Sequence, residues 1–405
     1  MNLRLTRDDQ SFVDSVRQFV ADHWHGDSPQ PGGLLAELRA EGMTAAERVW
    51  FDRLTAAGWS VPTWPIAEGG PGWSRTWQFL FMRELAVTGA PLPTSLATEV
   101  VATALFASAA STARTEWLND IRCWRSRWCL GVAEAEPLHT EATRVGSGFA
   151  VSGRKTWVTS GLVADWMLCR VGLDGQPVWM VVSLREAGVE VQALPVMGSA
   201  LAMASVQMTE VRVPAEACLG PALVGPALVG PAQKRAKYRP ISVAALVRSS
   251  LLRRDLQCLE AEPAIRENAA LLHACAELGV ALDGLEAMEL RGLMSADSLD
   301  PEILRSMLAI RGAEAGQKLG ELRIRSMGYH AVPFPDGERF SNEGVFGDEL
   351  ALPAVRRALF DRAWTMYAAH HADSSGRGAT SVEAIRDEMA RVILGSDPAE
   401  QFDKQ

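Results

Sequence analysis

The sequence lacks the features that are typical of metal-binding, disulfide-rich and membrane-spanning proteins. Its six cysteines form no CxxC pair, and its seven histidines are scattered apart from His370-His371, which lies in a Ser/Gly-rich stretch. No run of apolar residues is long enough to cross a bilayer. We therefore expect no metal site and no membrane-spanning helix, and we interpret the cysteines as ordinary buried thiols.

Positive charge is also scarce. The chain carries 40 Lys and Arg residues against 49 Asp and Glu residues, which gives a formal net charge of −9. No overall basic field is present to attract nucleic acid or anionic lipid, and no apolar signal region follows the first residues, Met1 to Asp9. The sequence therefore predicts a cytoplasmic protein that binds neither nucleic acid nor membrane.

The length and composition are those of a globular protein with several domains. The 405 residues exceed what one compact core usually holds, and 48% of them are hydrophobic. The first part of the chain is predicted to be helical, because Thr6 and the capping box Thr44-Ala-Ala-Glu47 are helix start signals and Gly58 is a stop signal. Two further helices are expected near 75–87 and 97–109.

The pattern then changes to the alternation that is typical of β-strands. Gly146-Ser-Gly148 predicts a hairpin turn, and the following residues to Trp157 predict its second strand. Further strands are expected at 178–183, 189–194 and 206–213.

Helical patterning returns after a tandem copy of Gly-Pro-Ala-Leu-Val that begins at Gly220, which we interpret as an expanded linker. Asp300-Pro301 predicts the N-cap and first residue of a long helix. The apolar stripe expected on that helix consists of Leu304, Leu308, Ala315, Leu319, Leu322 and Met327.

Five segments along the chain resemble the acyl-CoA dehydrogenase family when their order and spacing are taken together. These segments are Trp64-Pro-Ile-Ala-Glu-Gly-Gly70, Glu84-Leu-Ala-Val-Thr-Gly-Ala-Pro-Leu-Pro93, Gly153-Arg-Lys-Thr-Trp-Val-Thr-Ser160 with Ala164-Asp-Trp166 behind it, Val211-Arg-Val-Pro214, and the C-terminal helix at 383–395. The resemblance implies an α+β fold with an N-terminal α-helical domain (1–126), a middle β-barrel-like domain (127–219), a linker (220–240) and a C-terminal four-helix bundle (241–405).

The chemistry implied by the resemblance is α,β-dehydrogenation of a CoA thioester with FAD. In this family a carboxylate removes the proton alpha to the thioester, and the flavin takes the beta hydrogen as hydride. The resemblance implies that Trp157 packs on the flavin ring and that Thr159 and Ser160 lie beside it. Gly131 and Ala133 match the family's segment after the first strand of the β domain.

The chain departs from the family at several of these positions. Ala133 stands where relatives carry a hydroxyl that contacts the flavin, and Leu130 stands where many carry glutamine. The glycines that relatives carry after Tyr367 are replaced by Ala368 and Ala369. These departures therefore weaken the family's usual contacts at one wall of the flavin and thioester site.

Both usual positions of the catalytic carboxylate are empty. Ala351 stands where one branch of the family has its glutamate, and the region 236–248, where a second branch has it, contains no acidic residue. Loss of a positioned general base typically costs about 10²–10⁴ in rate. Glu349 and Asp348, two and three residues before Ala351, are nearby acids that could replace it, and Glu349 is the favoured candidate. A carboxylate near a helix N-terminus also has a purely structural explanation.

Three hypotheses follow from the resemblance. In the first, the chain is a partner subunit in an α2β2 acyl-CoA dehydrogenase that acts on a sterol or bile-acid side chain, and the other subunit supplies the base and most FAD contacts. In the second, it is an active homo-oligomer with Glu349 as a relocated base. In the third, it is a flavin monooxygenase on the same fold, which would still need good FAD contacts.

Overall fold

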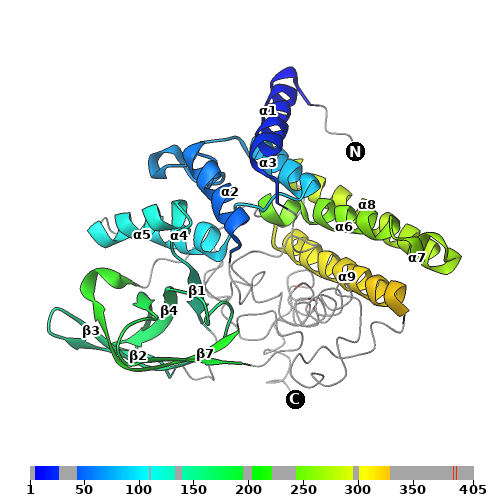
Figure 1. Cartoon of the computed structure of the whole chain (residues 1–405). Helices are drawn as coiled ribbons and strands as arrows, with labels where there is room; N and C mark the ends of the chain where they lie inside the picture. Colours follow the sequence, from blue (N-terminus) through cyan, green and yellow to red (C-terminus); the bar gives the residue numbers. More distant parts are fainter. Residues whose placement is uncertain are drawn as a thin grey trace, which may run out of the picture.

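The computed structural model describes residues 5–26, 43–108, 111–132, 139–194, 203–220, 243–294 and 301–328, together with positions 386 and 389. Figure 1 shows the first helices of the chain above and between a single β-sheet and a group of long helices. The architecture is therefore α+β, as the sequence predicted.

The helices that precede the sheet are α1 (Arg7–His23), α2 (Ala45–Ala56), the short 3₁₀ helix η2 (Ile66–Glu68), α3 (Arg75–Thr88), the π-helix η3 (Ala97–Val101), α4 (Ala102–Ala107) and α5 (Thr112–Arg122). Two of their start signals form complete capping boxes. The Thr6 hydroxyl accepts from the Asp9 amide at 3.1 Å while the Thr6 amide donates to the Asp9 carboxylate at 2.9 Å. Thr44 and Glu47 exchange the same two bonds at 3.2 and 2.7 Å, so these predicted helix starts are confirmed.

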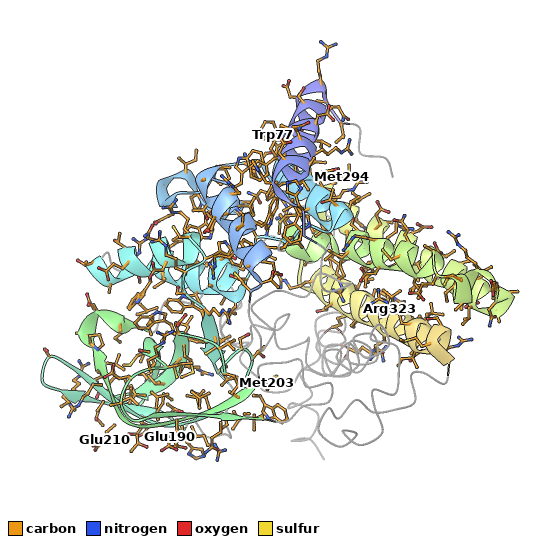
Figure 2. All side chains as sticks on the ribbon, in the orientation of Figure 1. Trp77, Glu190, Met203, Glu210, Met294 and Arg323 are labelled. Atoms are coloured by element: carbon orange, nitrogen blue, oxygen red, sulfur yellow. The ribbon has the colours of Figure 1, made fainter. Side chains whose placement is uncertain are left out.

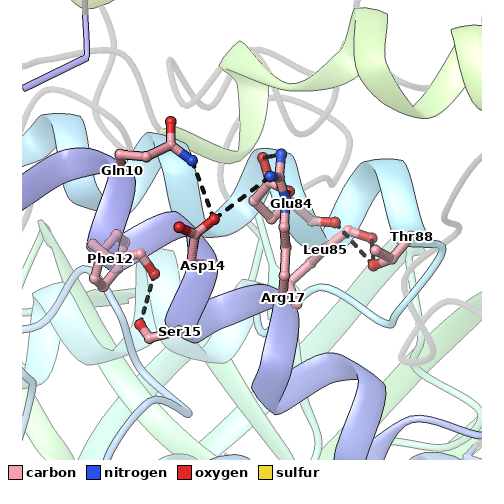
Figure 3. A network of polar contacts seen from close by, with 8 residues as sticks. All are labelled: Gln10, Phe12, Asp14, Ser15, Arg17, Glu84, Leu85 and Thr88. Carbon is pink, nitrogen blue, oxygen red and sulfur yellow. Dashed lines mark hydrogen bonds and ion pairs between the residues drawn. The ribbon is translucent and has the colours of Figure 1, made fainter. Parts of the chain in front are cut away.

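A partly buried ion pair joins α1 to α3. Arg17 Nε donates to Glu84 Oε2 at 2.8 Å, and the Glu84 side chain is only 9% exposed. Figure 3 shows this pair with Asp14, which lies 3.8 Å from the Arg17 guanidinium. The hydrogen bond to Glu84 and the negative charge of that carboxylate raise the pKa of Arg17 above its usual value. The pair fixes the register of the two helices together with a second polar contact, in which Trp77 Nε1 of α3 donates to Asp9 Oδ1 of α1 at 2.9 Å.

The N-terminal helices divide their apolar side chains between two separate cores. Residues of α1, α2 and α3 share one core with the helices that follow the sheet. Residues of η3, α4 and α5 share a second core with the sheet. Trp124 lies where the chain passes from α5 to the sheet; it belongs to the first core and stacks on Phe51 of α2, with ring centroids 4.0 Å apart.

The sheet strands are β1 (Trp128–Gly131), β2 (Glu141–Val145), β3 (Gly148–Val158), β4 (Trp166–Leu173), β5 (Gln176–Ser183), β6 (Val189–Ala193), β7 (Ala204–Pro214) and β8 (Cys218–Gly220). Their order is β6-β7-β3-β2-β4-β5-β8, with β1 parallel to β4. The predicted hairpin is confirmed, since β2 and β3 pair antiparallel around Gly146. The predicted strands at 178–183, 189–194 and 206–213 correspond to β5, β6 and β7.

The sequence did not single out β4, because most of its residues are buried on both faces and so do not alternate. The sheet also curls toward itself. β2 lies between β3 and β4 in the strand order, yet the Lys155 ammonium on β3 donates to the Arg170 carbonyl on β4 at 2.5 Å. A curled sheet agrees with the expected barrel-like domain.

The helices after the sheet are η5 (Val243–Leu246), α6 (Arg248–Glu260), α7 (Pro263–Arg266), α8 (Ala269–Met294) and α9 (Pro301–Met327). Pro301 begins α9 as predicted, and the stripe from Leu304 to Leu322 is buried, whereas Met327 is only partly buried. Asp300 lies outside the described residues, as does the linker from 221 to 240.

Two positions of the predicted C-terminal helix are described, and both lie against α9. Arg386 and Met389 are both helical. The Arg386 guanidinium lies 3.0 Å from the Glu314 carboxylate of α9, and Met389 packs against Ile310 of the same helix. The rest of the segment 383–395 lies outside the described residues.

Candidate functional site

The end of β3 presents a tryptophan in an unusual backbone conformation. Trp157 has φ +55° and is 43% exposed. The pairing of β3 with β7 shifts register between Lys155 and Val158, so Trp157 lies in a β-bulge. A bulky residue in the left-handed region is rare, and such strain gathers at functional sites. The bulge turns the indole away from the sheet interior.

The residues that follow Trp157 form a tight turn. Ser160 is buried with φ +63°, and its carbonyl accepts from the amides of Val163 and Ala164, both at 3.0 Å. The Thr159 hydroxyl lies 3.8 Å from the sulfur of Met203, at the start of the β7 segment (Figure 2). A thioether is a weak acceptor, so the hydroxyl has capacity for a stronger partner. Ser160 shapes the turn, while Trp157 and Thr159 carry the groups that can meet a ligand.

Hydrogen bonds to neighbouring strands hold the strained end of β3 in place. Lys155 is completely buried, and its ammonium donates to the Arg170 carbonyl. The Ser205 hydroxyl of β7 accepts from Arg154 Nε at 2.8 Å and donates to the Lys155 carbonyl at 3.3 Å. These bonds fix the backbone on both sides of the sheet just before the bulge, which holds Trp157 in position.

Gly131 lies on β1 and is explained by packing. A Cβ atom there would lie 2.6 Å from the sulfur of Met167 and 3.3 Å from that of Cys169. Burial, together with the neighbouring Cys169, raises the pKa of Cys129 on the same strand well above its usual value. This part of β1 is therefore closely packed, with unreactive thiols. Ala133 lies outside the described residues.

The expectation that all six cysteines are buried is wrong for half of them. Cys129, Cys169 and Cys275 are buried, whereas Cys123 and Cys218 are partly exposed and Cys258 is exposed. Cys258 lies on α6 at a position that faces solvent, which a count of cysteines cannot reveal.

Glu349, the candidate replacement for the catalytic base, and Ala351, at the family's usual base position, both lie outside the described residues. A different buried acid is present near the start of α6. Glu289 of α8 is 1% exposed and accepts from the Ser249 amide at 2.8 Å and from the Ser249 hydroxyl. Burial raises its pKa to about 7, although the bonds from Ser249 act in the opposite direction.

Glu289 has the pKa expected of a general base, but its geometry is that of a cap. Both carboxylate oxygens are engaged by Ser249, and the amide that it accepts belongs to the first turn of α6. A carboxylate at this place also offsets the positive end of the helix. Helical spacing in the sequence indicates that Glu289 is buried, because it falls on the same face of α8 as the buried Leu282 and Leu285.

The described residues offer no site for a metal and no membrane-spanning element. No three His, Cys, Asp or Glu side chains gather there in a group that could hold a metal ion. None of the described helices combines the length and the apolar character needed to cross a bilayer. His370 and His371 lie outside the described residues.

Comparisons with known proteins identify the first helices and the fold. Residues 6–122 match the family model "Acyl-CoA dehydrogenase, N-terminal domain". The acyl-CoA dehydrogenase IpdE1 of Mycobacterium tuberculosis is 25% identical over 227 residues, which cover 53% of this chain and 59% of that protein. The chain thus matches somewhat more than half the length of that curated relative.

Solved structures share the fold over nearly the whole chain. The "Tcur3481-Tcur3483 steroid ACAD" superposes with a TM-score of 0.73 at 17% identity, covering 98% of this chain and 100% of that one. A chain of the ChsE4-ChsE5 complex from Mycobacterium tuberculosis superposes with a TM-score of 0.67 at 17% identity, covering 98% and 99%. These likenesses confirm the predicted fold.

The buried Glu289 predicts an unusual dependence of stability on pH. Its pKa is raised on folding, so the folded state holds a proton that the unfolded state loses above a pH of about 4.5. The free energy of unfolding is therefore highest below that pH and falls as the pH rises. Above pH 7, ionisation of Glu289 lowers it by at most about 3 kcal/mol. Glu289→Gln should gain stability relative to the wild type between pH 5 and 8. Thermal melts across this range check it, with Glu321→Gln, at an exposed position of α9, as control. A difference between Glu289→Gln and the wild type that stays constant with pH would contradict the prediction.

Proposed function

Because this chain belongs to the acyl-CoA dehydrogenase family, a family of oxidoreductases, we propose that it is a subunit of an FAD-dependent enzyme that introduces an α,β double bond into a CoA thioester. The observation that carries the proposal is the strained, exposed Trp157 at the end of β3. Bound flavin would supply the acceptor for the hydride. The substrate proposed is a sterol or bile-acid side-chain thioester, which is supported by the steroid enzyme among the structural neighbours.

The residues at the end of β3 fit a planar aromatic ligand. Trp157 is held by the bulge and by the bonds around Lys155, and it offers a rigid surface for stacking. Thr159 adds a hydroxyl whose present partner is weak. We propose that Trp157 and Thr159 contact the flavin, and that Ser160 sets the turn between them and β4. Gly131, and Ala133 after it, would contribute backbone beside the ring.

We further propose that the catalytic base is supplied by a second acyl-CoA dehydrogenase chain in an α2β2 assembly. The sequence carries Ala351 at one base position and no acid in 236–248 at the other. Glu289, the buried acid near that second position, is engaged as a helix cap. The names Tcur3481-Tcur3483 and ChsE4-ChsE5 each join two different proteins, which supports a heteromeric assembly for this chain as well.

The assembly is tested by purifying the chain alone and together with a candidate partner, an acyl-CoA dehydrogenase chain from the same source that retains a catalytic glutamate. We expect the lone chain to be colourless and inactive, and the pair to form a heterotetramer with one FAD per pair. Native mass spectrometry and the flavin absorbance give both stoichiometries. A yellow homotetramer with one FAD per chain would overturn the partner role.

The flavin contact is tested in the same complex by Trp157→Ala. Loss of the stacking surface should weaken FAD binding roughly 2- to 10-fold, measured by fluorescence titration of the apoprotein. The melting temperature should change little, because alanine keeps the Cβ atom and the indole is 43% exposed. Trp124→Ala is the matched control: Trp124 has the same φ of +55° but is 7% exposed, so its loss should lower the melting temperature of the complex strongly.

The relocated base is tested by Glu349→Gln, which removes the charge and keeps the size. If the partner supplies the base, the complex should retain its turnover with an acyl-CoA and an artificial electron acceptor. A loss of about 10²-fold or more, with FAD content unchanged, would assign the base to Glu349 and make this chain the active subunit.

A further inference from the structure

An exposed arginine lies on β3 three residues before Trp157. Arg154 and Trp157 are both exposed, whereas Lys155 and Val158 of the same strand are buried, so the two exposed side chains point away from the interior of the sheet. Three residues of extended chain separate them by about 10 Å. The outer surface at this end of β3 therefore carries a flat aromatic ring and a positive charge at a short spacing.

The guanidinium of Arg154 is anchored by a buried hydroxyl. Its Nε donates to Ser205 Oγ at 2.8 Å, and Ser205, which is only 2% exposed, donates in turn to the Lys155 carbonyl at 3.3 Å. Within the part of the chain that the structure describes, the guanidinium makes no other hydrogen bond and no ion pair. The N–H groups on its two terminal nitrogens are therefore free to donate to a ligand.

The strands beside Arg154 place no carboxylate in contact with it. Gln207 of β7 is its partner in the register of β3 and β7. The exposed acid Glu190 (Figure 2) pairs with Gln207 on β6, two strands from Arg154, and the exposed Glu141 of β2 occupies a diagonal position. These positions correspond to separations of roughly 7–10 Å. Because the bond at Nε already orders the Arg154 side chain, little conformational entropy remains to be lost when a ligand binds.

We propose that Arg154 binds a phosphate group of the ligand that occupies the end of β3, an inference that rests on the proposed function. A guanidinium whose terminal nitrogens are both free binds phosphate through two parallel hydrogen bonds, a geometry that lysine does not offer. Trp157 supplies the stacking surface, and Arg154 selects ligands that carry a phosphate beyond it. FAD and a CoA thioester both carry phosphate groups, so the chemistry recognised is a phosphate ester.

The proposal predicts discrimination between phosphorylated and unphosphorylated probes. FMN carries a phosphate that riboflavin lacks, and coenzyme A carries phosphates that pantetheine lacks. Calorimetry on the flavin-free complex of this chain with its partner gives the affinity for each probe. Arg154→Gln should weaken the binding of FMN or of coenzyme A about tenfold or more relative to its unphosphorylated counterpart. The readout is the ratio within each pair, because loss of the bond to Ser205 would affect both members of a pair alike.

Two further variants sharpen the test. Arg212→Gln is the matched control, because Arg212 is also an exposed arginine of this sheet. It pairs with Ala150, and so lies about 13 Å further along the strands from Arg154. Arg212→Gln should leave both ratios unchanged. Arg154→Lys keeps the charge but loses the two parallel hydrogen bonds, so it should lower the affected ratio by an intermediate amount.

The pair of probes that responds to Arg154→Gln identifies the source of the phosphate, the flavin nucleotide or the CoA thioester. Ratios that Arg154→Gln leaves unchanged in both pairs, or that Arg212→Gln lowers equally, overturn the proposal. If Trp157→Ala still weakens riboflavin binding in that case, the flavin contact in the proposed function is retained and this inference alone fails. A wild-type complex that binds none of the four probes contradicts both.

Discussion

The structure depends on a division of the N-terminal helices between two hydrophobic cores. α1 to α3 pack with the helices after the sheet, while η3, α4 and α5 pack with the sheet. Neither group of helices can bury its apolar side chains alone. Because the two groups are joined, they hold the sheet and the helices after it in one arrangement. Trp124 stacks on Phe51 at the junction, and Arg48 of α2 donates to the Trp124 carbonyl at 2.5 Å. The position of the site relative to α6 follows from this shared packing.

That rigid support explains how the end of β3 can remain strained. Five non-glycine residues in the described chain have positive φ, and two of them, Trp157 and Ser160, lie within one turn of each other. Each such residue costs on the order of 1–3 kcal/mol. The cost is offset by hydrogen bonds just before the bulge, from Lys155 to the Arg170 carbonyl and from Arg154 to the Ser205 hydroxyl. Backbone strain of this kind gathers at functional sites, which is why the strand end is the best argument for a ligand.

The sequence predicted what depends on local signals and missed what depends on contacts between distant residues. The starts of α1 and α2 were predictable because Thr6 and Thr44 are bonded within their own first turns. The limits of α8 were not, because apolar residues on all its faces remove the helical period on which such a prediction relies. Trp157 was identified from its neighbours in the chain, but not its positive φ, which arises from the register shift against β7. The bond between Glu289 and Ser249 joins residues 40 positions apart, so no local pattern in the sequence predicts it.

Glu289 illustrates how a chain could keep this fold without a catalytic carboxylate, as the proposed partner role requires. A buried carboxylate stabilises a protein only where its bonds outweigh the loss of hydration. Glu289 satisfies the start of α6 and so has a structural reason to stay, even with its pKa raised to about 7. A base that must remain free to accept a substrate proton has no such bonds and lowers stability. In the partner role that we propose, the other chain would supply the proton acceptor, and alanine at position 351 would spare this chain the cost of a carboxylate without bonds.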